Sequence, residues 1–423
     1  MMERYREYKD SGVKWLGEIP SHWELRKMKY TFSERSQKGF PQEPLLASTQ
    51  THGVILKSQY ENRTVEAIKS LETLKLVEIG DFVISLRSFQ GGLEYAYNRG
   101  IISPAYTILT PTHIKADYFK YLSKSDIFIS LLKSSVTGIR EGQNIDYNKL
   151  KDNLLPIPSI EEQVSIGAYL YSATSEIDKA IAMQQKMIDL LNERKQIIIQ
   201  NAVTKGLDEN VEMKESGVEW IGRIPKHWEV LKLKRCAIIK TGTTPPTSNL
   251  KYFENGDIPW FTPGDINDMN LHLSSKTITK KAIEDNVGRL FPAKSIYFVG
   301  IGATVGKVAS CDFEASSNQQ INAIMCNDRL DYKFATYCLL MEQRIIRETT
   351  NFVTLPILNQ SSTGLINIVV PPKSEQQQIV TYLDGEMEKF DSAITNCQRQ
   401  ITLLQERKQI IINEVVTGKV RVS

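Results

Sequence analysis

The stretch KDSGVKWLGEIPSHWELRKMK (Lys9 to Lys29) occurs twice in this chain. It returns as KESGVEWIGRIPKHWEVLKLK (Lys214 to Lys234), with 13 of the 21 positions identical at an offset of 205. A second repeated pair follows later, because EQVSIGAYL…LLNERKQIIIQNAVT starts at Glu162 and EQQQIVTYL…LLQERKQIIINEVVT starts at Glu375. Two ordered matches of this length do not arise by chance. The 423-residue chain is therefore a tandem duplication of a unit of roughly 210 residues.

Two stretches between the repeated segments, residues 25–155 and 230–370, barely resemble each other. We call them insert 1 and insert 2, and the repeated remainder the frame. Only faint echoes remain between the inserts, such as Asp117-Tyr118 and Asp331-Tyr332 at an offset of 214. A purely structural duplication would drift everywhere. This pattern indicates that the frame binds the same partner twice, while the two inserts recognise two different ligands.

The second repeated pair predicts two long helices. Residues 162–203 contain no proline, and Gly206 and Gly418 follow the two segments as C-terminal stops. Apolar residues recur every three or four positions, which is typical of a coiled-coil seam: Ile166, Leu170, Ala173, Ile177, Ile181, Ile188, Leu191 and Ile198 in the first copy, with Ile379, Leu383, Met387, Phe390, Ile394, Cys397, Ile401, Leu404, Ile411 and Val415 in the second. Because a globular insert separates the helices, they most simply pack antiparallel. An ordinary bundle core is the alternative, but a length of about 63 Å favours a spacer.

The expected fold class is α+β. Mixed α/β recognition domains are combined with two long antiparallel coiled-coil helices in a pseudo-two-fold tandem duplication. The predicted division is an N-terminal frame segment (1–24), a first recognition domain (25–155), a central long helix (156–206), a second frame segment (207–229), a second recognition domain (230–370) and a C-terminal long helix (371–423).

Both inserts read as short strands followed by a helix. In insert 1 we expect strands at 81–86 and 101–109 and a helix at 116–134. In insert 2 we expect strands at 295–300, 305–310 and 321–326 and a helix at 330–348. The loops between these elements are polar and rich in glycine.

The W-x-G-x-I-P-x-H-W-E segments of the frame carry paired tryptophans and one histidine each. His22 and His227 invite a metal or acid–base interpretation, but each lies between Pro and Trp with no metal-ligand partner at the usual sequence spacing. We therefore expect packed turns that serve as docking surfaces or as caps on the neighbouring copy.

The polar loops of the inserts supply candidate DNA-reading residues. Arg, Gln, Asn and Ser side chains contact base edges, and Lys and Arg bind phosphates. The candidates are Arg87, Ser88, Gln90, Arg140, Gln143 and Asn144 in insert 1, and Thr304, Lys307, Gln319, Gln320, Asn359 and Gln360 in insert 2. Solvated loop residues without a ligand are the alternative interpretation for each.

Composition favours a cytoplasmic protein that binds nucleic acid weakly through charge. Insert 1 carries a net charge of about +5 and insert 2 about +3, on a chain whose total is +3, although chance variation in surface charge explains this equally well. The five cysteines form no C-x-x-C pair and fit reduced thiols. No run of about 18 apolar residues and no signal-peptide pattern occurs.

Catalytic motifs are absent from the sequence. We find no phosphate-binding G-x-x-x-x-G-K-[ST] loop, no N-P-P-Y or D-P-P-Y tetrapeptide of an amino-methyltransferase, no nuclease motif and no Cys/His cluster for a metal. The sequence thus predicts no catalytic residues, no metal and no cofactor in this chain.

The ordered combination of these motifs resembles the specificity subunits of type I restriction-modification systems. The resemblance rests on K-[DE]-S-G-V-x-W-[LI]-G-x-I-P-x-H-W-E before each insert, on PIPSIEEQ and PPKSEQQQ leading into the ERKQIII helices, and on GDIPWFTPGDI (256–266). It implies that two target-recognition domains each read half of a split site in double-stranded DNA. It also implies that the paired helices hold these domains apart and dock two methyltransferase subunits, while separate restriction subunits carry the ATP-driven motor and nuclease. Insert 1 lacks the GDIPW opening, so the resemblance is less specific there.

Two other classes of function are compared with this one. A standalone nuclease or methyltransferase is disfavoured by the missing motifs, and a coiled-coil adaptor that binds only proteins is disfavoured by the divergent basic inserts. A gel shift with DNA separates the adaptor from the DNA-binding subunit.

Overall fold

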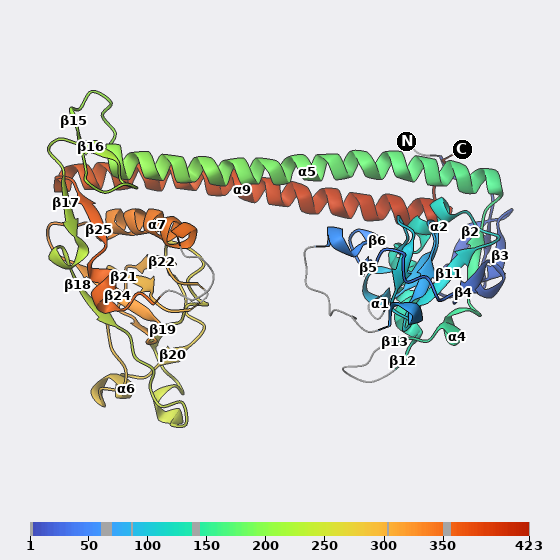
Figure 1. Cartoon of the computed structure of the whole chain (residues 1–423), viewed down its shortest axis with the longest axis horizontal. Helices are drawn as coiled ribbons and strands as arrows, with labels where there is room; N and C mark the ends of the chain where they lie inside the picture. The colour runs from blue at the N-terminus through green and yellow to red at the C-terminus, as the bar shows by residue number, and fades with distance from the viewer. Residues whose placement is uncertain are drawn as a thin grey trace. The chain divides into compact units, whose positions relative to one another are not determined.

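The computed structural model describes residues 3–60, 70–85, 88–137, 144–302, 304–349 and 357–422. The chain forms two compact units (Figure 1). Unit 1 comprises Met1–Gln185 and Gln398–Ser423, and unit 2 comprises Lys186–Cys397. Each unit therefore holds one frame segment, one insert and part of each long helix.

The two predicted long helices are α5 (Ile160–Lys205) and α9 (Lys373–Val416). In unit 1, Lys408 Nζ lies 2.6 Å from Asp178 Oδ1, and in unit 2, Lys195 Nζ lies 2.6 Å from Asp391 Oδ1. These two ion pairs are equivalent at the repeat offset of 213. In each unit the early part of one helix meets the late part of the other, which confirms the antiparallel packing.

Buried side chains of the two long helices join them to each unit's core. Toward the end of each helix the buried residue is Ile199 or Ile412, one position beyond the predicted Ile198 and Ile411. Ile166 and Leu170 of α5 belong to one cluster with Ile412 and Val415 of α9 in unit 1. In unit 2 the equivalent residues Ile199, Ala202, Ile379 and Leu383 share a cluster in the same way. At roughly 1.5–3 kcal/mol for each large buried side chain, these contacts are a main source of stability for the helix pair.

A buried glutamine at the start of each long helix ties it to an insert. Gln163 Oε1 accepts the Lys115 N–H at 2.7 Å, and Gln163 Nε2 donates to Pro158 O at 2.9 Å. Its repeat equivalent, Gln376, accepts the Asp331 N–H at 2.7 Å and donates to Pro371 O at 2.7 Å. The frame therefore anchors the helix of each insert by the same device.

Insert 1 contains a four-stranded antiparallel sheet followed by two short helices. The strand order is β4-β11-β8-β9, with β4 at Phe32–Arg35, β11 at Thr107–Pro111, β8 at Phe82–Ile84 and β9 at Glu94–Tyr95. The strand expected at 101–109 is two strands, β10 (Gly100–Ile102) and β11, because the chain turns at Ser103-Pro104 and Tyr106 N–H bonds to Ser103 O.

The helix expected at 116–134 is also divided, into α2 (Ala116–Leu122) and α3 (Asp126–Ser134). The Ser125 hydroxyl accepts the Phe128 N–H, which starts the second helix with a serine cap. Insert 1 therefore presents a turn at 123–125 where the sequence pattern predicts continuous helix.

Insert 2 has the same sheet order although its sequence has diverged. Its order is β18-β24-β21-β22, with β18 at Ala237–Thr241, β24 at Ile321–Cys326, β21 at Ser295–Val299 and β22 at Val308–Cys311. The predicted strands are confirmed, with β22 displaced by three residues at its start. One continuous helix, α7 (Tyr332–Thr349), follows the sheet, and a smaller sheet has the order β20-β19-β23, with β20 at Thr277–Ile278, β19 at Ile258–Phe261 and β23 at Ser316–Ser317.

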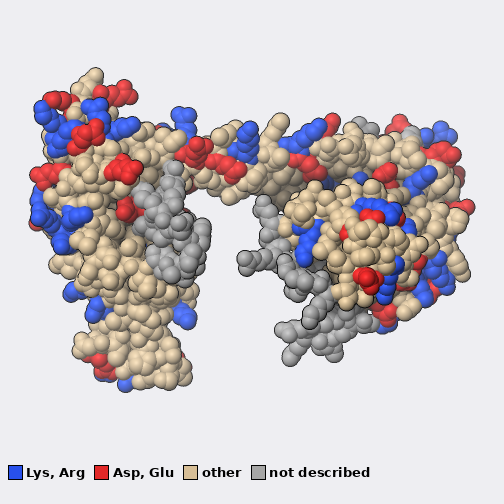
Figure 2. Space-filling view, viewed as in Figure 1, with Lys and Arg blue, Asp and Glu red and all other residues tan. Residues whose placement is uncertain are grey.

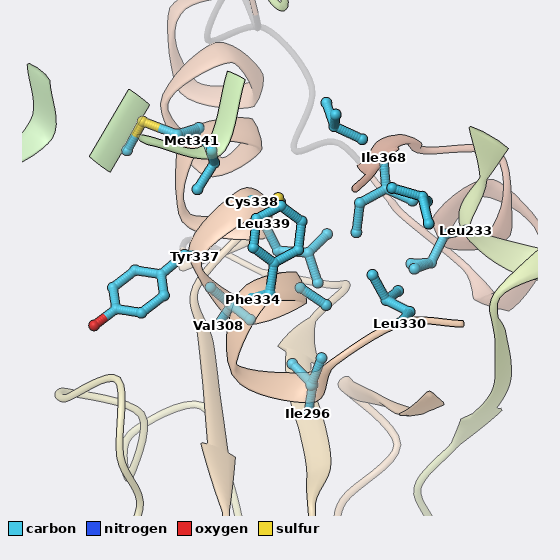
Figure 3. Close-up of a cluster of buried hydrophobic side chains, with 14 of the residues drawn as sticks. Leu233, Ile296, Val308, Leu330, Phe334, Tyr337, Cys338, Leu339, Met341 and Ile368 are labelled. Atoms are coloured by element: carbon cyan, nitrogen blue, oxygen red, sulfur yellow. The ribbon is translucent and has the colours of Figure 1, made fainter. Parts of the chain in front are cut away.

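The core of unit 2 lies between α7 and the sheet. Phe334 and Cys338 of α7 cluster with Ile296 of β21 and Val308 of β22 (Figure 3). Figure 3 also shows the ring of Tyr337 directed away from these side chains. Its hydroxyl donates to Asp384 Oδ1 of α9 at 2.7 Å.

The frame segments form small hairpins and edge pairs rather than simple turns. β1 (Tyr8–Asp10) pairs with β2 (Glu18–Pro20), and β15 (Met213–Glu215) pairs with β16 (Arg223–Pro225). β3 (Glu24–Lys27) pairs with β14 (Leu154–Ile157), and β17 (Glu229–Lys232) pairs with β25 (Asn367–Val370), so each frame segment also closes its insert.

The predicted caps are confirmed at the tryptophans. Trp23 and Trp228 are fully buried. A Cβ added at Gly418 would lie 3.0 Å from Trp23 Cη2, and one at Gly206 would lie 3.1 Å from Trp228 Cζ2. Both glycines have positive φ, the left-handed conformation that ends a helix. Trp23 thus covers the end of α9, and Trp228 covers the end of α5.

Candidate nucleic-acid interface

One edge of the sheet in insert 2 collects three polar loops. The registers Thr241↔Asn322, Val299↔Ile321 and Phe298↔Val308 place the end of β18, the start of β24, the end of β21 and the start of β22 at the same edge. The loops at 300–307 and 318–320 leave from this edge. Segment 357–360 joins them because Gly300 O accepts the Leu358 N–H at 2.8 Å.

All six candidates of insert 2 lie on these loops. Gln319 is exposed, and Gln320, Thr304 and Lys307 are partly exposed. The exposed residues Asn359 and Gln360 begin α8 (Gln360–Gly364), where Asn359 Oδ1 accepts the Ser362 N–H at 2.9 Å. The structure therefore brings together residues that the sequence separates by more than fifty positions.

Hydrogen bonds hold the polar side chains of this edge in place. Gln319 Oε1 accepts from the Thr244 hydroxyl, and Gln320 Oε1 accepts from Asn318 Nδ2 at 3.0 Å. Lys307 Nζ donates to Asn267 Oδ1 at 3.2 Å. Amide groups that are fixed on one side and exposed on the other are suited to paired contacts with base edges.

Close backbone contact at this edge also requires glycine. A Cβ at Gly242 would lie 2.3 Å from Ser317 O, and a Cβ at Gly300 would lie 2.4 Å from Leu358 O. Any larger residue at these two positions would push the loops apart.

The corresponding edge of insert 1 carries the 85–93 loop. The β8–β9 connection that contains this loop is equivalent to the β21–β22 connection in insert 2. Gln90 is exposed on α1 (Ser88–Gly91), and its Oε1 accepts from Gln50 Nε2 at 3.1 Å. Ser88 is fully buried, and its Oγ accepts the Ser85 N–H at 2.8 Å. Its hydroxyl starts the helical turn and is not presented at the surface, so the structure does not favour Ser88 as a DNA contact.

The other candidates of insert 1 have less structural description. Arg87, Arg140 and Gln143 lie outside the described residues. Asn144 begins β13 (Asn144–Ile145), which pairs with β12 (Val136–Thr137).

A buried ion pair supports the loop edge of insert 1. Lys124 Nζ lies 2.8 Å from Glu94 Oε2 and also donates to Gly91 O at 2.8 Å. Burial raises the pKa of the Glu94 carboxyl above its ordinary value, and Lys124 offsets part of that rise. Gly92 lies under the same lysine, with a φ of 85° and no room for a Cβ, which would be 2.0 Å from Ser123 O. Lys124 therefore fixes α1 to the start of α3.

Sequence reasoning missed two residues at these edges. Gln50, at the tip of the hairpin β5 (Leu46–Thr49) and β6 (Gly53–Leu56), reaches Gln90. Thr244 lies in the polar loop 241–253 and reaches Gln319. Thr244 stood in a loop whose composition already favoured binding, whereas no local signal distinguished Gln50.

The two frame histidines each have a carboxylate partner that lies far away in the sequence. His22 Nε2 lies 2.9 Å from Glu162 Oε1, and His227 Nε2 lies 2.8 Å from Glu375 Oε1. The partners were missed because they come from the distant helix starts, not from nearby sequence. The same carboxylates accept from the indole N–H groups of Trp23 and Trp228, so the pairs belong to the helix caps. Within the described part of the chain, no group of three or more His, Cys, Asp and Glu residues is arranged to hold a metal.

Surface charge is mixed on the face drawn in Figure 2, where Lys and Arg alternate with Asp and Glu. This agrees with the small total charge of +3. None of the described helices combines the length and apolar character needed to span a membrane.

The fold is that of a two-unit protein with a repeated frame and two unlike inserts, and it was compared with known proteins. The family model described as the type I restriction modification DNA specificity domain matches residues 225–405. The putative type I restriction enzyme MjaX specificity subunit of Methanocaldococcus jannaschii is 25% identical and covers 96% of both chains. The EcoR124I/EcoR124II specificity subunit of Escherichia coli is 26% identical over 60% of both chains.

A solved structure also shares the fold. A chain from a study of complex assembly and conformational transition in the type I R-M system superposes with a TM-score of 0.72 at 16% identity, covering 94% of this chain and 98% of that one. The sequence is thus similar to specificity subunits of type I restriction-modification systems over nearly its whole length, and its fold is similar to that of a chain from such a system. These relatives are named as specificity subunits.

Proposed function

We propose that the chain reads a bipartite site in double-stranded DNA in the cytoplasm, with one half of the site assigned to each insert. The observation that carries this proposal is the shared sheet order of two inserts whose edge loops have unlike sequences. A frame that holds two different loop sets on the same scaffold is suited to reading two different short sequences. We further propose that the recognition domains keep the boundaries 25–155 and 230–370.

The proposed base and phosphate contacts are the loop residues of these edges. They are Gln90, Arg87, Arg140, Gln143 and Asn144 in insert 1, and Thr304, Lys307, Gln319, Gln320, Asn359 and Gln360 in insert 2. Amide side chains suit adenine edges, and cationic side chains suit phosphates and guanine. With few cations at each edge, we expect weak binding by the isolated chain and tighter binding within a complex.

The long helices are proposed to dock two copies of a methyltransferase subunit. Leu190 and Ile197 of α5 are about half exposed in unit 2, and their repeat equivalents Leu403 and Ile410 of α9 are equally exposed in unit 1. Each pair is spaced by seven residues, so both members lie on one helix face. A duplicated exposed apolar pair on a duplicated frame fits the same partner bound twice. The methyltransferase subunits would bring S-adenosylmethionine, and restriction subunits would bring the ATP-driven motor and nuclease.

Exchange of insert 1 tests this proposal. Residues 25–155 are replaced by the corresponding insert of a relative, and the methylated motif is read by methylome sequencing in cells that also carry the methyltransferase subunit. We expect one half of the motif to change and the other half to remain. As a matched control, exchange of the frame segment 207–229 should leave both halves unchanged. Loss of both half-motifs in a folded chimera would contradict the assignment of one half to each insert.

A further inference from the structure

A cleft of about 1040 Å³ opens in unit 2 between insert 2 and the two long helices. Gln196 of α5, together with Met387 and Glu388 of α9, forms the helical wall. Tyr337 of α7 and Asp268 of the 267–272 loop form the opposite wall. Every residue lining the cleft belongs to unit 2.

The same place in unit 1 is filled by the chain itself. At the offset of 213, Gln196 corresponds to Gln409, whose Nε2 donates to Lys124 O at 3.1 Å. Four residues later, Asn413 Oδ1 accepts the Asp126 N–H at 3.0 Å. Met387 corresponds to Thr174, whose hydroxyl lies 3.5 Å from the Tyr121 hydroxyl. The end of α2 therefore lies against α5, and the turn and the start of α3 lie against α9.

The difference follows from how the helical part of each insert is built. Insert 1 breaks after Leu122 and starts α3 at Asp126, next to α9. In the described part of insert 2, α7 continues through the equivalent position, and no second helix turns toward α5. Gln196 is left exposed, whereas Gln409 is half-buried.

The segment that fills the place in unit 1 is basic and amphipathic. Lys120 Nζ lies within 6.0 Å of four tyrosine ring centroids, including that of Tyr171 on α5. Lys124 follows in the turn, and Phe128, Leu131 and Leu132 of α3 are buried. At the repeat offset, Tyr171 is replaced by Asp384 and Ser175 by Glu388, so the helix face in unit 2 is more acidic.

The open cleft has the complementary character. Glu388 and Asp268 are exposed, and neither has a hydrogen-bond or ion-pair partner among the described residues. Asp384 already accepts from Lys333 Nζ at 2.9 Å and from the Tyr337 hydroxyl at 2.7 Å. Buried Met387 and Met341 supply an adaptable apolar floor.

We propose that this cleft receives a short basic amphipathic helix from a partner protein, in the place that α3 takes in unit 1. Apolar side chains of that helix would cover Met387 and Met341, and its Lys or Arg residues would face Glu388 and Asp268. Because unit 1 is closed by its own α3, each chain offers this site once. The site is therefore distinct from the exposed apolar pairs that the frame repeats in both units.

A peptide of this chain provides the probe. Residues 120–134 (KYLSKSDIFISLLKS) are synthesised with a fluorescein label, and binding to the full chain is followed by fluorescence anisotropy near physiological salt. We expect saturable binding. The double variant Asp268→Asn with Glu388→Gln should weaken it about fivefold, since two exposed charge contacts are lost. Gln196→Trp, which places a bulky side chain in the cleft, should weaken it at least as much.

Two controls separate a local effect from a general one. The double variant Asp208→Asn with Glu209→Gln makes the same charge change in the exposed loop after α5 and should leave peptide binding unchanged. Thermal unfolding of each variant shows whether it is folded, and its DNA binding should be unaffected, so the outcome is separate from that of DNA recognition. No saturable binding, or binding insensitive to both cleft changes, would overturn the proposal. Binding of spermine in place of the peptide, with the same sensitivity, would also overturn it in favour of a small polycation.

Discussion

Unit 1 and unit 2 contact the long helices through the same frame residues but cover them with different insert residues. Both units use a buried glutamine at the helix start, a tryptophan–carboxylate contact and a Lys–Asp pair between helices. Apart from those shared contacts, the segment around α3 of insert 1 packs against the helices, while a cleft separates insert 2 from them. The comparison shows that the frame is constrained by its internal packing, whereas each insert is constrained only to keep its sheet.

The buried residues of the two sheets also differ while the strand order is the same. The strand registers place Glu94 of β9, opposite Val83 of β8, at the position of Ala309 of β22, opposite Tyr297 of β21. Insert 1 neutralises the buried Glu94 with Lys124, and insert 2 fills the place with an apolar side chain. Two chemical solutions therefore stabilise one strand position, so sequence identity is lost while the topology is kept.

The largest expected effect is a change of oligomeric state when the chain is cut between its two repeats. We expect the half-chain 1–212 to form a homodimer that reads an inverted repeat of the first half-motif. In the full chain, Trp23 packs on the end of α9 near Gly418, and Val416 completes the core of unit 1. The end of α5 in a second copy carries the equivalent Val203 and Gly206, so two-fold symmetry can replace pseudo-symmetry.

Mass measurement of the purified half-chain checks this prediction. A monomeric half would leave Ile188, Leu191 and Ile198 in water, because their partners in unit 2 are absent, at roughly 1.5–3 kcal/mol for each side chain. The full chain under the same conditions is the control. A stable, folded monomer would show that α5 cannot take the place of α9.

Much of the fold of the frame could be predicted from the sequence, because the frame's amino-acid sequence occurs twice. The long helices, their antiparallel packing and the glycine stops follow from periodicity and the 213-residue offset. The break between α2 and α3 could not be predicted, since residues 116–134 keep helical periodicity and the break depends on the Ser125 cap and on Lys124 reaching Glu94. Tertiary contacts of this kind leave no local pattern.

The candidate interface was predictable in part for the same reason. Glycine-rich polar loops led to Gln319 and Gln90, which lie at equivalent sheet edges. Composition could not separate the buried Ser88 from its exposed neighbour Gln90. Ser88 differs only in the folded chain, where its hydroxyl accepts a hydrogen bond from the Ser85 N–H. Gln50 was missed because its partner lies 40 residues away.

The next largest effect concerns the spacing between half-motifs. Deleting 181–187 from α5 and the equivalent 394–400 from α9 removes one heptad from each helix, so that both Lys–Asp pairs can still form. If the helices set the spacing, the gap should shrink by about 10 Å, or about three base pairs. Methylome sequencing of cells with the variant gives the gap directly. An unchanged gap in an active variant would show that the helices do not set it.

A smaller effect is expected at the buried pair of insert 1. Lys124→Met leaves Glu94 buried without its cation and should lower the free energy of unfolding by about 3 kcal/mol. The double change Glu94→Leu with Lys124→Met, which puts an apolar side chain in this place as Ala309 does in insert 2, should recover much of that loss. Chemical unfolding of both variants measures the difference, and equal losses in both would show that the lysine acts mainly through Gly91 O.

The pH dependence of Lys124→Met has a defined sign. Burial raises the pKa of Glu94 in the folded protein, so the folded state favours the protonated carboxyl. Stability is therefore retained at pH values below the ordinary carboxyl pKa and lost as the pH rises through the raised value. Without Lys124 the pKa rises further, and the deficit of the variant should be larger at pH 8 than at pH 5. A deficit that grows on acidification would contradict this account.

The smallest expected effect tests the equivalence of the two units most directly. The pairs Asp178–Lys408 and Asp391–Lys195 have nearly the same exposure, with side chains 55% and 31% exposed in the first and 60% and 28% exposed in the second. Exposed ion pairs contribute about 0.5 kcal/mol, and salt screens them. Double-mutant cycles with Asp→Asn and Lys→Gln should therefore give coupling energies of about 0.5 kcal/mol in both units, each reduced in 1 M salt. The Lys389–Glu386 pair, which lies within α9 alone, is the control for a pair that does not join the helices. The two pairs have the same residues, nearly the same distances and nearly the same exposure, so their coupling energies should be equal. If one interhelical coupling energy exceeded the other by more than about 1 kcal/mol, the frame would not be equivalent in the two units.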